Sequence, residues 1–425
     1  MNLAFVTPRY GAEITTGAEH VCRLLAEQAS TRHHIDVLTT CARDPLSWHN
    51  EYPEGADRVR GVLVRRFAVN QPHDPAAFRQ LSARLRGAPQ GRADEQEWVR
   101  SLGPTSPALV EFLRRQHRSY DAVVFFSLFH ATTVSGIAAV PDRSVLFPYL
   151  RLDPALRYGL WADVFASARG VGYVSSSERA LARDFLGVTP AAEEIVGIGV
   201  ETPAQQAYPR HQQDPEDAVA EPDEAESGDE EQAEAPRGYL EGRGVLFRRR
   251  HRLYGPFALY GGRITPDNGS IEMLEYFDRY TSADGDTALV LMGIKMMNVP
   301  EQRHVRLAGV LPGCERLMAY EAADVAVAPE PDDLLATTVL ENFAVGTPVL
   351  AAVRNGAAVE HCRRANAGLY YANGAEFVEA LTALMTKSRL RAQLGENGRR
   401  YVSQHYRWDA VLGRFERLMM RVRRT

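Results

Sequence analysis

The chain has 425 residues, of which 45% are hydrophobic and 24% charged, and its formal net charge is −5. This length and composition indicate a globular protein of two domains. The four cysteines lack the spacing of zinc ligands or of a disulfide framework, and no apolar run reaches the ~18 residues of a membrane span, so we expect none of these features. Residues 1–7 begin directly with a strand-like run, so we expect no signal peptide and a cytoplasmic protein.

The N-terminal half alternates short apolar runs with helical patterns. The predicted strands are residues 3–7, 35–39, 61–67, 122–126 and 144–147. A helix is predicted at residues 17–30, and Ser175 is expected to cap another helix whose first turn carries Glu178. Apolar strands joined by helices are typical of a parallel sheet that is covered on both faces, which predicts an α/β fold class.

An acidic segment follows. Residues 214–234 hold eleven acidic and no basic side chains. The rest of the chain is therefore net basic, which suits an anionic ligand. We expect a disordered insertion or linker at residues 204–238, and a docking element for a protein partner is the alternative. The basic run at residues 248–252 is either a solvated turn or a peripheral contact with an anionic membrane surface at its inner face.

The C-terminal half repeats the strand–helix alternation. Its predicted strands are residues 257–260, 288–292, 305–308, 325–328 and 348–351. A last helix is predicted at residues 408–421. Its apolar face should consist of Val411, Leu412, Phe415, Leu418 and Met419.

The turn after the strand at residues 257–260 can hold a phosphate. Gly261 and Gly262 allow a tight turn beside a ligand, and a helix beginning near Gly269 would offer free N–H groups and a positive dipole end. Arg263 adds a fork of donors that suits phosphate. The alternative is an ordinary strand–helix turn with a surface arginine.

Two carboxylates lie eight residues apart in the next informative stretch. Asp333 is expected in a loop, where it can accept a hydrogen bond from a sugar hydroxyl. Glu341 is expected in the first turns of a helix, where it can hold the paired hydroxyls of a ribose. The alternative is that both acids complement the helix dipole. Together with the glycine turn they favour a nucleotide-activated sugar outside the carboxyl ends of the strands.

These motifs resemble those of the retaining glycosyltransferases of family 4 (glycosyl transferases group 1). The resemblance rests on the strand–glycine–arginine turn, the acid-x7-Glu motif, the Gly-Thr-Pro-Val that begins at Gly346, and residues 366–371, 397–408 and 8–19. It implies the GT-B fold, with two Rossmann-like domains facing across a cleft. Residues 1–203 would form the acceptor domain and residues 239–405 the donor domain, and a C-terminal helix at residues 406–425 would return to the N-terminal domain.

The resemblance also implies roles for single residues. Glu341 matches the glutamate that holds the ribose, Asp333 the acid near the donor sugar, and Arg263 the arginine on the diphosphate. Gly17 matches a loop glycine that faces the phosphate. The other residues assigned to the donor are Gly262, Leu335, Ala336 and Thr337. The family needs no essential metal or other cofactor, and the departing phosphate helps to take the acceptor proton.

Three positions depart from the family pattern. Asn268 stands where the family usually has a lysine, and losing such a stabiliser of the leaving group typically costs a factor of about 10² to 10³. Lys295 either substitutes for that lysine or is a surface side chain. Arg151 stands near the position, after the strand at residues 144–147, where related sequences have a histidine. It is either a catalytic residue that binds an acidic acceptor or donor, or part of a structural salt bridge. Asp333 replaces a glutamate.

The leading prediction is therefore transfer of a sugar, with retention, from a nucleoside diphosphate sugar to an acceptor hydroxyl. The acceptor is left open among a glycan, a lipid-linked glycan and a small molecule, and no nucleic-acid partner is expected. Asn268 and Arg151 motivate an alternative, a weakened or inactive partner of an active enzyme. A nucleotide-sugar epimerase is a third hypothesis.

Overall fold

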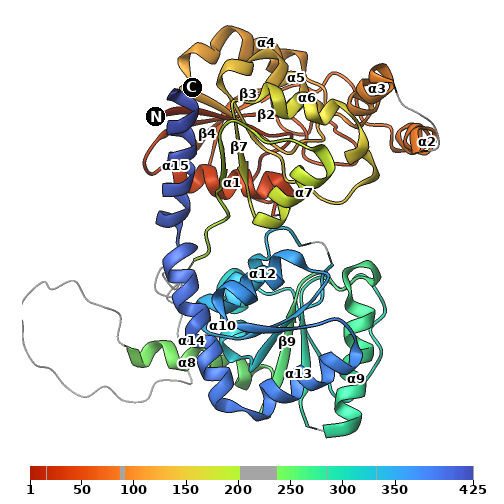
Figure 1. Cartoon of the computed structure of the whole chain (residues 1–425), viewed down its shortest axis with the longest axis vertical. Coiled ribbons are helices and arrows are strands. Elements are labelled where there is room, and N and C mark those ends of the chain that lie inside the picture. The colour runs from red at the N-terminus through yellow and green to blue at the C-terminus, as the bar shows by residue number, and fades with distance from the viewer. Residues whose placement is uncertain (16, 87–90, 202–236, 285, 332, 425) are drawn as a thin grey trace, which may run out of the picture. The chain divides into compact units, whose positions relative to one another are not determined.

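The computed structural model describes residues 1–15, 17–86, 91–201, 237–284, 286–331 and 333–424 (Figure 1). They form two compact units. The N-terminal unit comprises Met1–Gly199 and Trp408–Thr425, and the C-terminal unit comprises Val200–Arg407. The acidic insertion expected at residues 204–238 lies outside the described residues, except for its last two positions.

In its described part, the N-terminal unit has an eight-stranded sheet with the order β3-β4-β2-β1-β5-β6-β7-β8. Every neighbouring pair is parallel except β3 and β4. The strands are β1 (Asn2–Val6), β2 (His34–Thr40), β3 (Gly55–Val59), β4 (Val62–Phe67), β5 (Ala122–Phe126), β6 (Ser144–Phe147), β7 (Gly170–Tyr173) and β8 (Glu193–Ile195). The helices are α1 (Gly17–Ala29), α2 (Pro75–Arg86), α3 (Arg92–Leu102), α4 (Pro107–Gln116), α5 (Ala131–Ala139), α6 (Leu160–Ser167), α7 (Ser176–Leu186) and α15 (Trp408–Arg424).

The strands predicted in this half are confirmed to within one residue at each end. The strand β7 was not predicted because it reads Gly-Val-Gly-Tyr and lacks an apolar run. Its glycines are required by packing: a Cβ at Gly172 would overlap the ring of Phe147, and one at Gly170 would lie 2.5 Å from Val422 Cγ2. Glycine therefore lets the neighbouring side chains reach the sheet.

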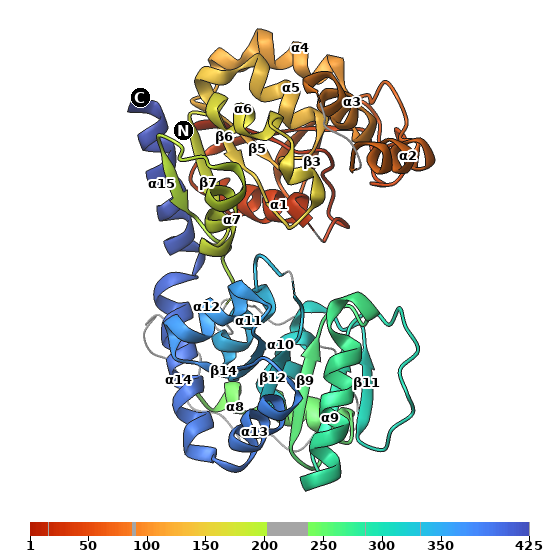
Figure 2. The same cartoon turned by 45° about the vertical axis from the view of Figure 1, so that its right-hand side comes forward.

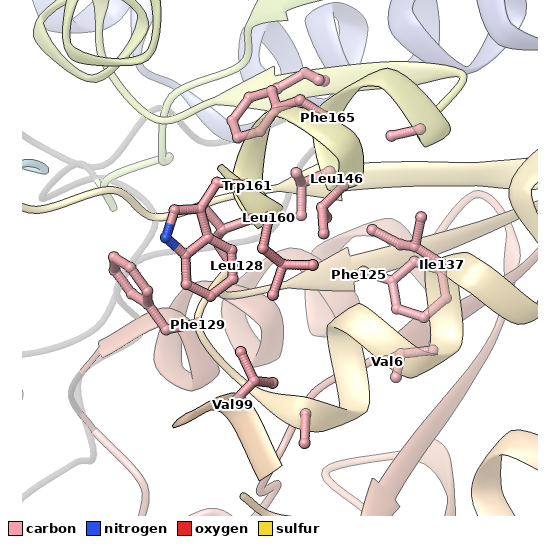
Figure 3. Packing of buried hydrophobic residues seen from close by; sticks show 14 of the residues in the cluster. Val6, Val99, Phe125, Leu128, Phe129, Ile137, Leu146, Leu160, Trp161 and Phe165 are labelled. Atoms are coloured by element: carbon pink, nitrogen blue, oxygen red, sulfur yellow. The ribbon is translucent and has the colours of Figure 1, made fainter. Parts of the chain in front are cut away.

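A hydrophobic core of the N-terminal unit packs side chains of β1, α3, β5, α5, β6 and α6 together with those of the loops that follow β5 and β6 (Figure 3). Trp161 of α6 is fully buried, and its indole N–H donates to the Ala155 carbonyl at 2.6 Å. The ring of Phe129 packs edge-on against it at a centroid distance of 5.1 Å. Each such buried ring contributes roughly 2–3 kcal/mol by area, which fixes these loops.

The last helix returns to the N-terminal unit, as predicted. Helix α15 packs against β7 and β8 and also contacts β5 and α1 (Figure 1). The five apolar residues predicted for its buried face are at most 2% exposed. The ring of Phe415 reaches Phe5 and Phe147, at 5.8 and 6.2 Å between centroids. The amphipathic pattern thus buries this face against the sheet.

The described residues of the C-terminal unit form a six-stranded, all-parallel sheet with the order β11-β10-β9-β12-β13-β14 (Figure 2). The strands are β9 (Phe257–Gly261), β10 (Ala288–Met292), β11 (Val305–Gly309), β12 (Val325–Ala328), β13 (Val349–Ala352) and β14 (Gly368–Tyr371). The helices are α8 (Arg237–Arg250), α9 (Ser270–Asp284), α10 (Gly313–Ala322), α11 (Thr337–Val345), α12 (Gly356–Ala365), α13 (Gly374–Thr386) and α14 (Ser388–His405). The five strands predicted here are confirmed to within one residue.

Helices cover both faces of this sheet. Helices α9 and α13 pack on one face, and α8, α10, α11 and α12 pack on the other. Alternate residues of β9 therefore face opposite layers: Tyr260 faces α9, and Leu259 faces α10. This alternation decides which side chains reach the loops at the carboxyl end of the sheet.

The basic run at residues 248–252 begins inside a helix, which corrects the interpretation of the whole run as a solvated turn. Arg248 donates to the Ala322 carbonyl at 2.6 Å and to Asp324 at 3.0 Å, and Arg250 pairs with Glu315 at 3.1 Å. These arginines anchor the end of α8 to α10. Within the described ranges, no helix is both long and apolar enough to cross a membrane.

Candidate functional site

The winding of the C-terminal sheet reverses between β9 and β12. From β9 the chain first runs outward through β10 to β11, and then returns to the opposite side of β9 as β12 (Figure 2). Ligands of such sheets bind outside the carboxyl ends of the strands at this switch point. The loops at residues 262–269 and 329–336, which follow β9 and β12, flank it.

The loop after β9 is braced from within. The Tyr260 hydroxyl donates to the Arg263 carbonyl at 2.8 Å, and the Asn268 amide nitrogen donates to the Tyr260 hydroxyl at 2.9 Å and to the Arg263 carbonyl at 3.1 Å. The Arg263 guanidinium is exposed and forms no ion pair with any residue that the structure describes. Asn268 therefore holds the loop, and Arg263 keeps its donors available for an anion.

The close approach of neighbouring loops requires glycine at two positions. A Cβ at Gly262 would lie 2.6 Å from the Tyr260 hydroxyl oxygen and 2.9 Å from Glu330 Oε1. Gly293, at the end of β10, has φ +136°, and a Cβ there would overlap the Gly262 carbonyl oxygen. Gly262, which we expected beside the donor, is therefore also required by packing within the protein.

Asp333 organises the loop that leads into α11. Its carboxylate accepts the Leu335 N–H at 3.2 Å and interacts with the Ala336 N–H, while burial raises the pKa of Asp333. Ala336 is fully buried and has a left-handed conformation with φ 44°, which costs an alanine about 1–2 kcal/mol. Among the residues that the structure describes, no side chain caps α11, so the N–H groups that begin at Thr337 remain available at this edge. The N–H groups that Asp333 accepts precede α11, so both a contact with the donor sugar and the alternative, an acid that complements the helix dipole, stay predictions.

Glu341 lies in α11 and pairs with a cation. Arg316 donates to Glu341 Oε1 at 2.6 Å, and the Glu341 side chain is 14% exposed. Burial raises the pKa of Glu341, and Arg316 opposes that rise. One turn earlier in α11, the Thr338 hydroxyl approaches the Gly261 carbonyl at 3.5 Å. Glu341 and the loop of Arg263 therefore belong to the same edge of the sheet.

Sequence analysis did not identify Glu330 or Arg316 as site residues. Glu330 is half-buried two residues after the end of β12, beside Tyr260 and near Gly262. Burial raises the pKa of Glu330 to about 8, and the charge of Asp333 adds to the effect. An acid soon after an apolar strand at the switch point would have been a signal for Glu330. No sequence signal marks Arg316, because its role depends on contact with a distant helix.

Lys295 lies on the loop after β10. Ile264 and Lys295 form a parallel bridge, so this loop runs beside the loop of Arg263. The Lys295 side chain is exposed and lines a cavity together with residues such as Val299 and Leu307, on the β11 side of the sheet. Its proposed replacement of the missing lysine stays a prediction.

The N-terminal sheet has its own switch point, between β1 and β5. Arg9, on the loop after β1, pairs with Glu19 at 3.0 Å. Gly17 begins α1 with φ +77°. His130, at the start of α5, shares a 2.7 Å hydrogen bond with the Ser127 hydroxyl, and burial lowers the pKa of His130 to about 4. This histidine is therefore neutral near pH 7.

Arg151 is exposed on the loop after β6 and forms no ion pair with the residues described for this unit. The alternative that Arg151 forms a structural salt bridge is therefore not supported. Buried Glu178 holds this loop, since its carboxylate accepts the Leu150 N–H at 2.8 Å and the Val174 N–H at 2.6 Å. The predicted cap of α7 is confirmed, because the Ser175 side chain accepts the Glu178 N–H. The charge of Arg151 acts on His130, so both lie near the carboxyl ends of β5 and β6.

The predicted site residues thus divide between two sheet edges. The edge of the C-terminal sheet holds Gly262, Arg263, Asn268, Lys295, Asp333, Leu335, Ala336, Thr337 and Glu341. Gly17 and Arg151 belong to the edge of the N-terminal sheet. Among the residues that could be searched, no group of three His, Cys, Asp or Glu side chains is arranged to hold a metal ion. The four cysteines are free.

Comparison with known proteins supports the predicted fold. Residues 247–401 match the family model of glycosyl transferases group 1. Similar solved structures include sucrose-phosphate synthase from Thermosynechococcus elongatus (TM-score 0.62, 16% identity, 99% of each chain covered) and WaaG, a glycosyltransferase involved in lipopolysaccharide biosynthesis (0.59, 15%, 97% of this chain and 98% of that one). HepE from Anabaena in complex with UDP has a TM-score of 0.66 at 12% identity, covering 99% of this chain and 100% of that one, and it was also solved with UDP-glucose. Curated protein sequences give no match. At these identities the structures share a fold with this chain, which confirms the predicted GT-B class.

Proposed function

We propose that this chain, in which residues 247–401 belong to glycosyl transferases group 1, transfers a sugar from a nucleoside diphosphate sugar to an acceptor hydroxyl with retention. One observation carries the proposal: Arg263, which forms no ion pair among the described residues, and Glu341, which is partly buried, flank the switch point of one parallel sheet. A diphosphate and a ribose require such a cation and such an acceptor at the same edge.

The donor would bind along this edge. The diphosphate would accept hydrogen bonds from Arg263 and from the uncapped N–H groups at the start of α11. The ribose hydroxyls would donate to Glu341, which Arg316 orients. The strained backbone at Ala336 supports this assignment, since such strain tends to be retained where a ligand contacts the chain.

The residues of the C-terminal unit would act on the leaving group. As the bond between the anomeric carbon and the phosphate oxygen breaks, negative charge grows on the diphosphate, and Arg263 is positioned to stabilise it. The departing phosphate would take the proton of the acceptor hydroxyl, so no protein nucleophile and no metal are required. Asn268 lacks the charge of a lysine, which leaves Arg263 and the α11 terminus as the proposed stabilising groups. The acceptor is assigned to the N-terminal unit.

Thermal unfolding with a panel of nucleoside diphosphates (UDP, GDP, ADP, CDP and dTDP) tests donor binding. A ligand at 100 times its Kd stabilises the native state by about 2.7 kcal/mol. We expect one member to raise the Tm, and the variant Arg263→Ala to lose that rise while its ligand-free Tm stays within about 2 °C of wild type, because Arg263 is exposed. Stabilisation by no member, or equal stabilisation of the variant, would refute the proposal.

Turnover separates the alternatives. Incubation with UDP-glucose and with other nucleoside diphosphate sugars should release the diphosphate in the presence of an acceptor, and NMR of the product should show the configuration of the donor. Binding without turnover of any acceptor or of water would instead support an inactive partner. Release of a free, altered sugar with no acceptor present would support an epimerase.

A further inference from the structure

We propose that the cavity beside β11 is an anion-binding site, separate from the donor site at the carboxyl ends of β9 and β12, which takes an organic ligand that carries a phosphate group. Residues of the edge strand β11 and of the loop at residues 293–304 line this cavity (Figure 2). Its volume of about 650 Å³ lies within the range of small-molecule sites. The proposed sugar transfer gives the cavity no role, and the inference does not depend on that reaction.

The lining of the cavity is positively charged. Lys295, Arg303 and Arg306 belong to it, against one acid, Glu301, which leaves a net charge of +2. The three cationic side chains are exposed, and none of them forms an ion pair with the residues that the structure describes. The Arg306 guanidinium donates to the Arg303 carbonyl at 2.9 Å, which keeps the two arginines together. Their remaining donors can bind the oxygens of a phosphate group, whose charge of about −2 matches that of the lining.

Apolar side chains beside these charges favour an organic ligand over a bare inorganic ion. Val299 and Leu307 line the same cavity, and Leu307 is 50% exposed although it belongs to a strand. A ligand whose carbon skeleton covered Leu307 would remove apolar surface from water, which adds to the attraction of the charges. The lining therefore suits a phosphate group on an apolar skeleton.

The loop that forms one wall of the cavity is held in place without a ligand. The Ile264 N–H donates to the Ile294 carbonyl at 2.9 Å, and the Met296 N–H donates to the Ile264 carbonyl at 3.0 Å. Further along the loop, Val299 is 7% exposed and packs into the core that includes residues of α9. The cavity is therefore largely preformed, so binding requires little ordering of the chain.

The strand register separates this cavity from the donor site. β11 runs parallel to β10, and its first residue, Val305, pairs with Leu289 near the amino end of β10. Arg303 and Arg306 therefore lie toward the amino ends of the strands, whereas the donor would bind at the carboxyl ends. The five residues of β11 span roughly 13 Å. A ligand bound to these two arginines would leave the donor site open.

Binding of 1-naphthyl phosphate, a probe that joins a phosphate group to an apolar ring system, tests the site. Calorimetry at low ionic strength, where screening is weak, compares wild type with the double variant Arg303→Gln/Arg306→Gln. The control is Arg389→Gln/Arg407→Gln, which removes the same charge from exposed arginines outside the cavity. We expect the cavity variant to bind the probe about tenfold more weakly and the control variant to bind it like wild type. Equal losses in both variants, or no loss in either, would overturn the proposal.

Two related compounds separate the charge of the probe from its apolar surface. Inorganic phosphate keeps the charge and 1-naphthol keeps the ring system, and each should bind wild type several-fold more weakly than 1-naphthyl phosphate does. Inorganic phosphate that binds as tightly as the probe would contradict the assignment of an organic ligand, and 1-naphthol that does so would contradict the role of the cations.

Hydrogen exchange on wild type locates the site and does not depend on the folding of a variant. The probe should slow amide exchange in residues 295–307 more than in residues 262–269, the loop of Arg263. Protection confined to residues 262–269, or no protection at all, would overturn the inference. UDP is expected to show the reverse preference and is measured separately, so a failure of the anion site can be told apart from a failure of the proposed function.

Discussion

The ion pair between Arg316 and Glu341 offers a sharp prediction, because it separates ligand binding from stability. The substitution Glu341→Gln keeps the shape of the side chain and removes its charge. Hydrogen bonds to a charged acceptor are worth roughly 1.5–3 kcal/mol, against about 0.5–1.5 kcal/mol for neutral pairs. For two ribose hydroxyls, of which an amide oxygen can serve one well, we expect a loss of about 2 kcal/mol. This corresponds to a roughly thirtyfold higher Kd for UDP.

The effect of the same substitution on folding should be small. The Arg316 side chain is 44% exposed, so solvent screens the pair, and its contribution to unfolding free energy should stay below about 1 kcal/mol. Burial also raises the pKa of Glu341, so the neutral amide avoids part of the desolvation cost of the carboxylate. We therefore expect the Tm without ligand to shift by less than about 2 °C.

Deoxynucleotides locate the lost interaction. Wild type should bind 2′-deoxy-UDP or 3′-deoxy-UDP more weakly than UDP, and Glu341→Gln should show much less of that discrimination. The resulting coupling energy should exceed about 1 kcal/mol. Glu315→Gln is the control, because Glu315 lies on α10 beside Arg316 but pairs with Arg250 at 3.1 Å. Additive losses, or an unchanged Kd for UDP in Glu341→Gln, would refute the assignment of Glu341 to the ribose.

Three further predictions test the framework of the site. Gly293→Ala should lower the free energy of unfolding in urea by at least about 2 kcal/mol, because a φ of +136° is unsuited to alanine and the new Cβ would overlap a carbonyl oxygen. Gly309→Ala is the control, since Gly309 has a φ of +74° but lies in open space, and it should lose about 1 kcal/mol. Equal losses in the two variants would contradict the packing around Gly293. Asn268→Ala removes two hydrogen bonds of about 1 kcal/mol each from the loop of Arg263 and should raise the Kd of UDP several-fold by calorimetry; an unchanged Kd would show that the amide does not position the loop. Burial raises the pKa of Glu178 from 4.5 to about 7, so the native state binds a proton at Glu178 more tightly than the unfolded chain does. The free energy of unfolding of wild type, relative to that of Glu178→Gln, should therefore fall by on the order of 3 kcal/mol as the pH rises from 4.5 to above 7. A difference in unfolding free energy between wild type and Glu178→Gln that does not vary with pH would contradict the buried environment of Glu178.

Much of the fold could be predicted because its strands are buried on both faces. β5 and β10 are continuous apolar runs, and their predicted bounds match the structure. β3 is mostly exposed at the edge of its sheet, and β8 is a three-residue strand at the other edge, so neither has the apolar pattern that predicts a strand. β7 is buried but rich in glycine, because side chains from other elements occupy the space where its own would lie.

The candidate site was predictable where motifs are local and not where contacts are distant. Arg263 stands two residues after the end of β9, so its place at the sheet edge could be predicted from the sequence. The partners of Glu341 and Glu330 come from α10 and β9, which fold next to them only in the complete sheet. The sequence could show an asparagine at residue 268, but not the contacts of its amide with Tyr260 and the Arg263 carbonyl.

A crystal structure of the chain with bound UDP would test the central claim most directly. We predict that the diphosphate contacts the Arg263 guanidinium and that the ribose hydroxyls lie within hydrogen-bonding distance of Glu341. UDP bound away from the carboxyl ends of β9 and β12, or bound there without contact to either side chain, would contradict the account.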